Sequence, residues 1–407
     1  MALSATEHED LTRASQASAG STAQYLSDTT NNAARIKALT AAKNLLFELQ
    51  NGDDAFFYRL EQVAAATVLR FLINVKALEA MPQHHPISAA DLATTLHCEP
   101  AFIIRLMRLC VAAGTFAEPT LDTYAHTKRS LSLLDPGYYH FFTIMMDDFY
   151  ARGCFPALSE YFALRERKCP SDPKRNVYTY SQGMDGRDWH EVFARTPELL
   201  RRVNVAFSGR WASVPVLGAY PFEGLVDMGF EGGDGEEGRV LMVDVGGAVG
   251  GSMKELREAV PGLKGVIVLQ DQESVIGSIP EGFLSGDVVP MVHDFFTPQP
   301  VKGAKVYYMR RVLHDWPDLQ ASQILQHQAD AMAEDSIILI ADMVVPEKVQ
   351  RDDTYVYWMD LTMLMFAGKG RSAKDWQKLF DESGLELVKI WEPAIGTQCV
   401  VEGRKKK

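Results

Sequence analysis

The sequence predicts an α/β protein in which a doubly wound parallel sheet follows a helical region with a winged-helix block. Three observations support this. Apolar runs alternate with helical patterns from residue 239 onward, which is typical of parallel strands joined by helices. Two helical patterns and a hairpin pattern follow one another over residues 86–126. The 407 residues, 47% of them hydrophobic, suffice for two or three domains.

The first 32 residues predict a flexible arm, because they are rich in Ser, Thr, Ala and Asn and show no apolar periodicity. Residues 33–135 predict a helical and winged-helix domain. Its apolar stripes at 36–49 and 63–78 exceed what one small helical unit can bury. We therefore expect these stripes to lie between the two subunits of a homodimer.

The winged-helix block begins with Ser88 as a helix N-cap and Asp91 three positions later. A second helix should end at Gly114, and residues 116–124 should form a hairpin. Winged helices often read DNA, but this second helix has few cations and the chain has a net charge of -12. Because phosphate contacts need a basic face, nucleic acid is not an expected partner.

Residues 136–235 are expected to be a mainly helical linker and to supply a substrate pocket. Residues 138–150 are a run rich in aromatic residues and methionines. Taken alone, such a run is more often part of the core than of a pocket, and His140 inside it would then be a hydrogen-bonded core histidine. The end of the Gly-rich segment 224–238 predicts a loop. The candidate pocket residues are His140, Met145, Phe149, Phe207 and Trp211.

Residues 236–407 predict the domain that contains the sheet. The run VDVGGAVGG at 243–251 joins the first strand to a helix, and its glycines let a ligand approach and leave N–H groups free. Ligands of such sheets bind at the carboxyl ends of the strands. Strands are expected at 239–245, 265–269, 288–292, 304–309, 336–342, 385–391 and 398–402, and helices at 253–260, 319–333, 354–366 and 373–383.

Polar residues follow these strand ends. Asp271 ends the second strand and suits ribose hydroxyls, whether the cofactor is a dinucleotide or another nucleoside. The run HDFF at 293–296 closes the third strand and offers a carboxylate and a flat ring for an adenine. The run YYMRRVLHDWPD at 307–318 closes the fourth strand and opens a helix.

The ordered runs DVGG, QD, HDFF and RRVLHDWPD resemble the plant and fungal small-molecule O-methyltransferases that use S-adenosylmethionine. Order and spacing agree over about residues 239–403, and the winged-helix block is similar to that family's dimerisation domain. The resemblance implies a Rossmann-like methyltransferase domain and a homodimer. It also implies S-adenosyl-L-methionine as cofactor and an aromatic or polyketide-like secondary metabolite as substrate.

The resemblance further implies roles for individual residues. His314 matches the family's general base, Asp342 the acid that orients it, and Arg310 a basic residue of the pocket with a share in catalysis. Imidazole titrates near neutral pH and so suits the deprotonation of a phenol, after which the oxygen and the methyl group need chiefly alignment. No metal is implied. Cofactor contacts are implied for Asp244, Gly246, Gly247, Asp271, Asp294, Phe295 and Arg310.

Three positions depart from the family pattern. Ala248 replaces the third glycine of the turn, and Gly251 stands where a polar or aromatic residue is common. Gly370, within GKGRS at 368–372, replaces a glutamate that would be a second partner for His314. An alternative is therefore an enzyme of this fold that catalyses dehydration or pericyclic ring closure without methyl transfer, with His140 or Arg310 sharing the work of His314. A nicotinamide dehydrogenase and a DNA-binding regulator are the remaining alternatives.

The chain carries no sign of export or of a membrane. No apolar run approaches the ~20 residues that cross a bilayer, and the N-terminus lacks the pattern of a secretory signal. Five dispersed cysteines without metal-ligand spacing fit a reducing compartment. We expect a cytoplasmic protein with neither a metal nor a membrane partner.

Overall fold

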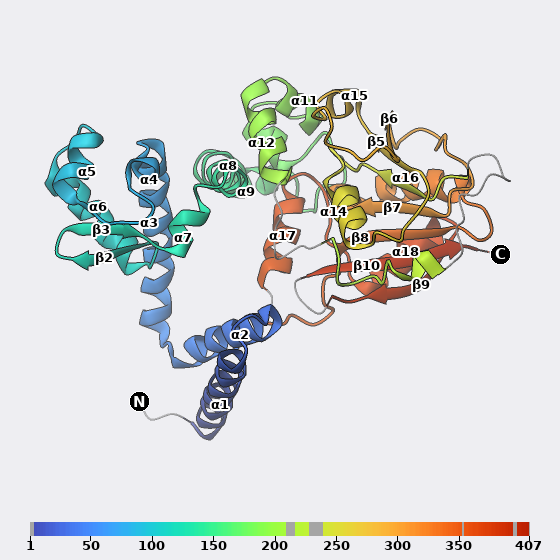
Figure 1. Ribbon diagram of the computed structural model, residues 1–407. Coiled ribbons are helices and arrows are strands. Elements are labelled where there is room, and N and C mark those ends of the chain that lie inside the picture. Colours follow the sequence, from blue (N-terminus) through green and yellow to red (C-terminus); the bar gives the residue numbers. More distant parts are fainter. Residues whose placement is uncertain (1–3, 209–215, 228–238, 352–353, 394–396, 407) are drawn as a thin grey trace. The chain divides into compact units, whose positions relative to one another are not determined.

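The computed structural model describes residues 4–208, 216–227, 239–351, 354–393 and 397–406 (Figure 1). The chain divides into two compact units. The first comprises residues 1–24, 38–156 and 193–209, and the second comprises residues 25–37, 157–192 and 210–407.

The N-terminal segment is helical, which corrects the expectation of a flexible arm. Helix α1 covers Ala5–Ser27. Ser4 caps it, because its Oγ accepts the Glu7 N–H while the Glu7 carboxylate accepts the Ser4 N–H at 2.7 Å. The segment is alanine-rich and contains no proline. Local propensity and the cap therefore favour a helix although no apolar stripe repeats along it.

The two apolar stripes differ in burial. They lie on α2 (Asn32–Leu49) and on α3 and α4 (Gly52–Asn74 and Ala77–Ala80). Part of the second stripe packs inside its own chain, so the expectation that all of it faces a partner is wrong. The reason is that α3 packs on α6 (Pro100–Ala112) in one core. The buried residues are Leu69, Leu72 and Leu78, whereas Leu39, Leu46, Leu49 and Val63 are exposed.

The winged-helix block is confirmed. Strands β1 (Ile87–Ser88), β2 (Phe116–Thr120) and β3 (Thr123–His126) form a sheet in the order β1-β3-β2, with α5 (Ala89–Thr95) and α6 before the hairpin. The Oγ of Ser88 accepts the Asp91 N–H at 3.1 Å and caps α5 as expected.

Residues 128–208 are mainly helical, as the sequence predicts. In the first unit, α8 packs against α12 and continues into the π-helix η1. A π-helical turn is rare and often marks a functional segment. The elements are α7 (Lys128–Ser132), α8 (Pro136–Ile144), η1 (Met145–Ala151), α9 (Cys154–Leu164), α10 (Val177–Ser181), α11 (Trp189–Ala194) and α12 (Pro197–Ser208).

The second unit contains a sheet of seven strands in the order β6-β5-β4-β7-β8-β10-β9 (Figure 1). Helices α16 and α18 pack on one face and α14 on the other. The strands are β4 (Met242–Val245), β5 (Ile267–Asp271), β6 (Val288–Val292), β7 (Val306–Arg310), β8 (Ile337–Met343), β9 (Leu385–Trp391) and β10 (Gln398–Lys405). The helices are α13 (Gly224–Asp227), α14 (Gly251–Ala259), α15 (Glu273–Ile276), η2 (Leu313–Asp315), α16 (Asp318–Ala331), α17 (Thr354–Leu364) and α18 (Ala373–Glu382).

The sheet is mixed, which corrects the expectation of an all-parallel one. Strand β10 runs antiparallel to both β8 and β9. Only a short segment links Trp391 to Gln398. A parallel pair needs a crossover of a dozen or more residues, so this link permits only a hairpin.

The order of the strands defines where a ligand can bind. From β4 the chain moves outward to β5 and β6, then returns to β7 on the other side of β4 and continues to β8. The direction of winding thus reverses between β4 and β7. In open sheets of this kind the ligand crevice lies at the carboxyl ends of the strands beside such a reversal.

Candidate active site

The glycine turn after β4 is tied to the neighbouring strand. Gly246 has φ +70°, and a Cβ there would stand 2.9 Å from Cγ2 of Val312, so this position requires glycine. The N–H groups of Gly246 and Gly247 donate to the Gln270 carbonyl at 2.9 and 3.1 Å. The expectation that the turn leaves these groups free is therefore wrong for these two, because β5 takes them up.

Asp271 lies beside this turn, at the carboxyl end of β5. Its Oδ2 accepts the Ala248 N–H at 2.8 Å, and its Oδ1 accepts the Gln272 N–H at 2.8 Å. Ala248 has φ +53°, so it adopts the left-handed conformation that the glycine of the family would adopt without strain. The substitution thus keeps the turn and the contact that fixes Asp271.

Asp244 supplies an unpartnered buried charge next to the turn. Its side chain is 1% exposed, and neither carboxylate oxygen has a hydrogen-bond partner among the described residues. Burial first, and then the charge of Asp271, raise the pKa of Asp244 to about 7, while Arg310 opposes the shift. A buried carboxylate of this kind needs a donor or a cation. The amino group of an amino-acid ligand has that chemistry, so Asp244 fits the methionine part of the implied cofactor.

Aromatic rings and a cation surround the other side of the turn. The ring of Phe295 lies 3.7 Å from the place where a Gly246 Cβ would stand, and it meets Trp316 edge to face at 6.0 Å. Asp294 is held by its Oδ1, which accepts the Phe296 N–H at 3.0 Å. Arg310 ends β7, where burial lowers its pKa. The structure thus brings Phe295 to the glycine turn, and its place near adenine stays a prediction.

His314 and Asp342 form a buried pair. His314 lies in the 3-10 turn η2 after β7, Asp342 lies near the end of β8, and Nδ1 of the imidazole is 2.6 Å from Oδ1 of the carboxylate. Burial lowers the pKa of His314, but the carboxylates of Asp342 and Asp315 outweigh it and leave that pKa above its ordinary value. Burial raises the pKa of Asp342, but the charge of His314 and the bonds from His314 and Met343 outweigh it and leave that pKa low. The pair is therefore ready to hold a proton on Nδ1 and leave Nε2 as an acceptor.

Sequence reasoning gave no role to Asp315, although it stands in the HDWPD run. Its Oδ1 lies 3.5 Å from Nε2 of His314, the nitrogen that Asp342 does not contact. A carboxylate near each nitrogen stabilises the protonated imidazole. The signal in the sequence was the adjacency of the two residues, which the 3-10 turn converts into proximity.

The place of the missing glutamate is filled. The Gly370 N–H donates to Oδ1 of Asp360 on α17 at 2.7 Å, and a Cβ at Gly370 would stand 2.9 Å from Cγ2 of Val345. Burial raises the pKa of Asp360. No room is left for a larger residue unless Asp360 moves. Asp342 and Asp315 are the carboxylates in contact with His314 in the described part of the chain.

Four of the candidate pocket residues (His140, Met145, Phe149 and Phe207) belong to the first unit, whereas the residues above belong to the second. His140 lies on α8, and Met145 and Phe149 lie buried on η1. Phe207 is in α12, and its side chain, like all of Trp211, lies outside the described residues. Burial lowers the pKa of His140, with Arg201 and Arg202 adding to the effect, and its Nδ1 has no partner in the described structure. Their role in substrate binding stays a prediction.

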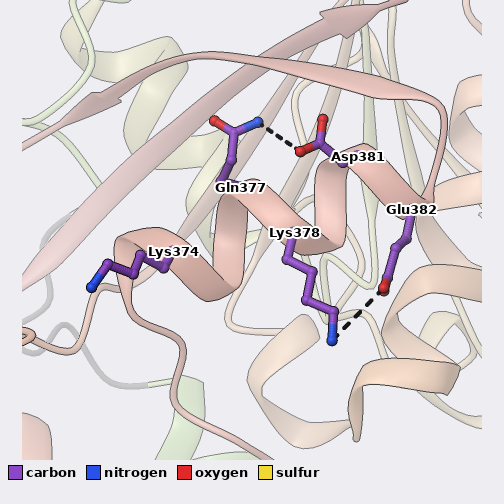
Figure 2. Close-up of a pocket in the computed structure, with 5 residues that line it drawn as sticks. All are labelled: Lys374, Gln377, Lys378, Asp381 and Glu382. Atoms are coloured by element: carbon purple, nitrogen blue, oxygen red, sulfur yellow. Dashed lines mark hydrogen bonds and ion pairs between the residues drawn. The ribbon is translucent and has the colours of Figure 1, made fainter.

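Other features of the described chain do not add a site. A hollow along α18 is lined by exposed charged and amide side chains, of which Gln377 pairs with Asp381 and Lys378 with Glu382 (Figure 2). It extends to Asp381, which pairs with Lys406 beyond the end of β10 and so lies toward the edge of the sheet opposite His314. Among the described residues no cluster of His, Cys, Asp or Glu could hold a metal ion, and no helix is long and apolar enough to cross a membrane.

Two networks around the site escaped sequence reasoning. Buried Gln299 bonds to Gln270 at 2.8 Å and to Gln328 at 2.9 Å, behind the strand end that carries Asp271. Buried Arg371 donates to the main chain on both sides of His314. Isolated glutamines and an arginine far along the chain give no signal of such contacts.

A Rossmann-like sheet with a glycine turn, acidic strand ends and a buried His–Asp pair defines a nucleoside-cofactor enzyme, and comparison with known proteins identifies its family. Residues 236–386 match the model of the O-methyltransferase domain, and residues 59–136 match that of the O-methyltransferase dimerisation domain. The chain is 31% identical over 363 residues to the O-methyltransferase opaF of Aspergillus ustus, covering 88% of this chain and 84% of that protein. It is also 31% identical over 367 residues to the O-methyltransferase kntB of Aspergillus niger, covering 88% and 85%. The chain belongs to the O-methyltransferase family, whose cofactor is S-adenosyl-L-methionine.

Solved structures agree on the fold. OxaC superposes with a TM-score of 0.82 and 26% identity over 98% of this chain and 100% of its own, and it is also known in complex with sinefungin and meleagrin. LepI in complex with S-adenosylmethionine superposes with a TM-score of 0.84 and 24% identity, covering 94% and 97%. A chain described as a pericyclic reaction enzyme gives the same values.

Proposed function

We propose that this protein transfers the methyl group of S-adenosyl-L-methionine to a hydroxyl of an aromatic or polyketide-like secondary metabolite, with His314 as general base. The buried His314–Asp342 pair at the carboxyl end of the sheet carries the proposal. His314 follows β7 and Asp342 lies near the end of β8, at the carboxyl ends of two neighbouring parallel strands. Ligands of open sheets bind at such strand ends, beside a reversal of winding like that between β4 and β7. The family and its named relatives support the same reaction.

The residues of the pair have distinct tasks in this reaction. Asp342 accepts a hydrogen bond from Nδ1–H of His314 and so fixes the tautomer whose Nε2 is free to accept a proton. The acceptor hydroxyl gives its proton to Nε2 as its oxygen forms a bond to the methyl carbon. The bound cofactor would supply an electrophilic methyl group, whose bond to sulfur would break as its bond to the acceptor oxygen forms. The carboxylate of Asp315, near Nε2, stabilises the imidazolium that results.

The proposed roles of the cofactor-side residues follow from their positions. Asp244 receives the ammonium group, Asp271 the ribose hydroxyls, and Phe295 packs near adenine beside Asp294. Gly246 and Gly247 allow the close approach, and Arg310 lines the pocket. His140, Met145, Phe149, Phe207 and Trp211 are proposed to contact the substrate.

The active form is proposed to be a homodimer in the cytoplasm. The matched dimerisation domain covers residues 59–136. Exposed apolar side chains on α2 and α3, including Leu46, Phe56 and Phe57, supply the surface that a second subunit would bury.

A second candidate is ring closure or dehydration without methyl transfer. The observation that favours it is that Gly370 stands where the family pattern has a glutamate. Asp360 occupies the space that a side chain at this position would need. A solved structure with the same fold is that of a pericyclic reaction enzyme, which supports ring closure as the alternative. In this case His314, Arg310 or His140 would donate a hydrogen bond to a polarised carbonyl.

Mass spectrometry separates the two. A panel of phenolic and enolic polyketide-like acceptors is incubated with the protein, with and without S-adenosyl-L-methionine. Methyl transfer adds the mass of one CH2 unit and requires the cofactor's methyl group. An isomeric product or one that has lost water, formed also with the demethylated cofactor, overturns the first proposal in favour of the second.

A further inference from the structure

The turn that carries His314 is held by a buried arginine from a distant part of the sequence. Arg371 is 1% exposed. Its Nη1 donates to the main-chain oxygen of Leu313 at 2.7 Å, and its Nη2 donates to that of Trp316 at 2.9 Å. One guanidinium thus bonds to the main chain at the residue immediately before His314 and at the second residue after it.

The same arginine is itself fixed from several directions. Its Nε donates to Oδ1 of Asp318 at 3.1 Å, and its guanidinium lies 5.5 Å from the centre of the Trp376 ring. Lys369 strengthens this end, because its Nζ bonds to the other oxygen of Asp318 at 2.9 Å and to Asp375 at 2.8 Å. Such a rigid fork of donors is particular to arginine, since a lysine has a single ammonium group on a flexible stem.

The main chain next to Arg371 completes the link between the two partners of the pair. The Lys369 N–H donates to the main-chain oxygen of His314 at 2.9 Å. The Arg371 carbonyl accepts the Val345 N–H at 2.9 Å, just beyond the end of β8, which carries Asp342. Residues 369–371 therefore bond to the His314 turn on one side and to the Asp342 strand on the other.

We propose that Arg371 is a positioning residue that sets the imidazole of His314 against the carboxylate of Asp342, an inference that rests on the proposed role of His314. Without the fork, the main-chain oxygens of Leu313 and Trp316 and Oδ1 of Asp318 lose the guanidinium as a donor, and the turn is free to shift. An error of about 1 Å in a reacting group costs up to roughly 10²-fold in rate. The positive charge also helps to keep Asp342 ionised, since it lowers the pKa of that carboxyl.

The test uses Arg371→Lys, which keeps the charge beside Asp342 but removes the fork. The full-length protein is labelled with ¹⁵N-histidine, His314 is assigned with a His314→Gln variant, and its titration is followed by NMR without substrate. We expect the His314 midpoint to move to lower pH, because the charge and the hydrogen bond of Asp342 raise the pKa of His314 and both depend on this contact. We also expect kcat to fall about 10- to 100-fold with the dissociation constant of S-adenosyl-L-methionine unchanged.

The matched control is Arg257→Lys. Arg257 also donates to two main-chain oxygens, those of Leu263 and Gly265, and pairs with Asp287 at 2.8 Å, but it lies at the end of α14. It should lower thermal stability without moving the His314 titration. If Arg371→Lys does not fold, Asp318→Asn weakens the same fork from a half-exposed position and should shift His314 in the same direction by less.

Two results overturn the proposal. One is an unchanged His314 titration in a folded Arg371→Lys or Asp318→Asn variant. The other is an equal shift in Arg257→Lys, which would mean that general loosening is the cause. Because the NMR readout needs no turnover, it stands even if no acceptor is methylated, whereas failure of the proposed function shows separately as full activity of a His314→Ala variant.

Discussion

Nδ1 of His314 lies 2.6 Å from Oδ1 of Asp342, although 28 residues separate them in the sequence. The contact arises because β7 and β8 are parallel neighbours, so that the carboxyl ends of both strands, where His314 and Asp342 lie, are side by side. The same Oδ1 accepts the Met343 N–H at 2.8 Å, so the carboxylate is fixed by the main chain of its own strand. This geometry directs the first two predictions.

Replacing His314 with alanine should abolish most methyl transfer. Loss of a general base lowers rates by about 10²–10⁴-fold. Calorimetry should show nearly unchanged binding of S-adenosyl-L-methionine, because the imidazole is proposed to face the acceptor. The exposed His84→Ala serves as control and should keep the parent rate. Full activity of His314→Ala would remove the base assignment.

The rate should depend on pH through the His314–Asp342 pair. A base must be neutral, and the pKa of His314 is raised above its ordinary value of 6.5. Activity should therefore be complete at high pH and fall as the pH drops through a midpoint above that value. In Asp342→Asn the midpoint should move to lower pH, and kcat should fall by roughly 10²-fold or more because the tautomer is no longer held. A pH–rate profile identical to that of the parent would contradict the pairing.

Asp271→Ala should weaken cofactor binding. The substitution removes the acceptor for ribose hydroxyls and for the Ala248 N–H. Each charge-assisted bond contributes ~1.5–3 kcal/mol, so calorimetry should detect at least about a tenfold loss of affinity. Asp287→Ala, in the segment just before β6, is the control and should bind normally. Tight binding of NADH, with no binding of S-adenosyl-L-methionine or of its demethylated product, would instead indicate the dehydrogenase alternative.

Restoring the glutamate of the family pattern should not improve the enzyme. In Gly370→Glu the new Cβ would stand 2.7 Å from Oδ1 of Asp360, which now accepts the Gly370 N–H. Overpacking of this kind costs about 1–3 kcal/mol, so the melting temperature should fall. Adding Asp360→Ala should recover part of it by making room. A Gly370→Glu variant more stable and more active than the parent would show that the space around residue 370 is larger than its contacts indicate.

Charges on the exposed face of α3 should dissociate the homodimer. Phe56 and Phe57 are more than half exposed in the single chain. Phe56→Glu with Phe57→Glu should raise the dimer dissociation constant at least about tenfold, because apolar aromatic anchors dominate such interfaces. Light scattering after gel filtration measures the change, with exposed Leu164→Glu as control. A parent protein that is monomeric at micromolar concentration would contradict the expected dimer.

Elements that depend on local chemistry could be predicted from the amino-acid sequence. Ser88 and Asp91 predicted a capped helix because a cap needs only neighbouring residues. The glycine turn and the HDFF and HDWPD runs marked the ends of β4, β6 and β7, because each run directly follows its strand within a few residues of the sequence. The tertiary structure alone decided the contacts between distant residues. The hairpin of β9 and β10 made the sheet mixed, and parallel pairing of β7 and β8 joined His314 to Asp342. Arg371 reached Leu313, in the His314 turn, across 58 residues. The tertiary structure also decided that Leu69 and Leu72 pack within the chain and that Asp360 fills the space at Gly370. The reason is that apolar periodicity and residue type indicate what a side chain can bury or bond, whereas the fold selects the partner.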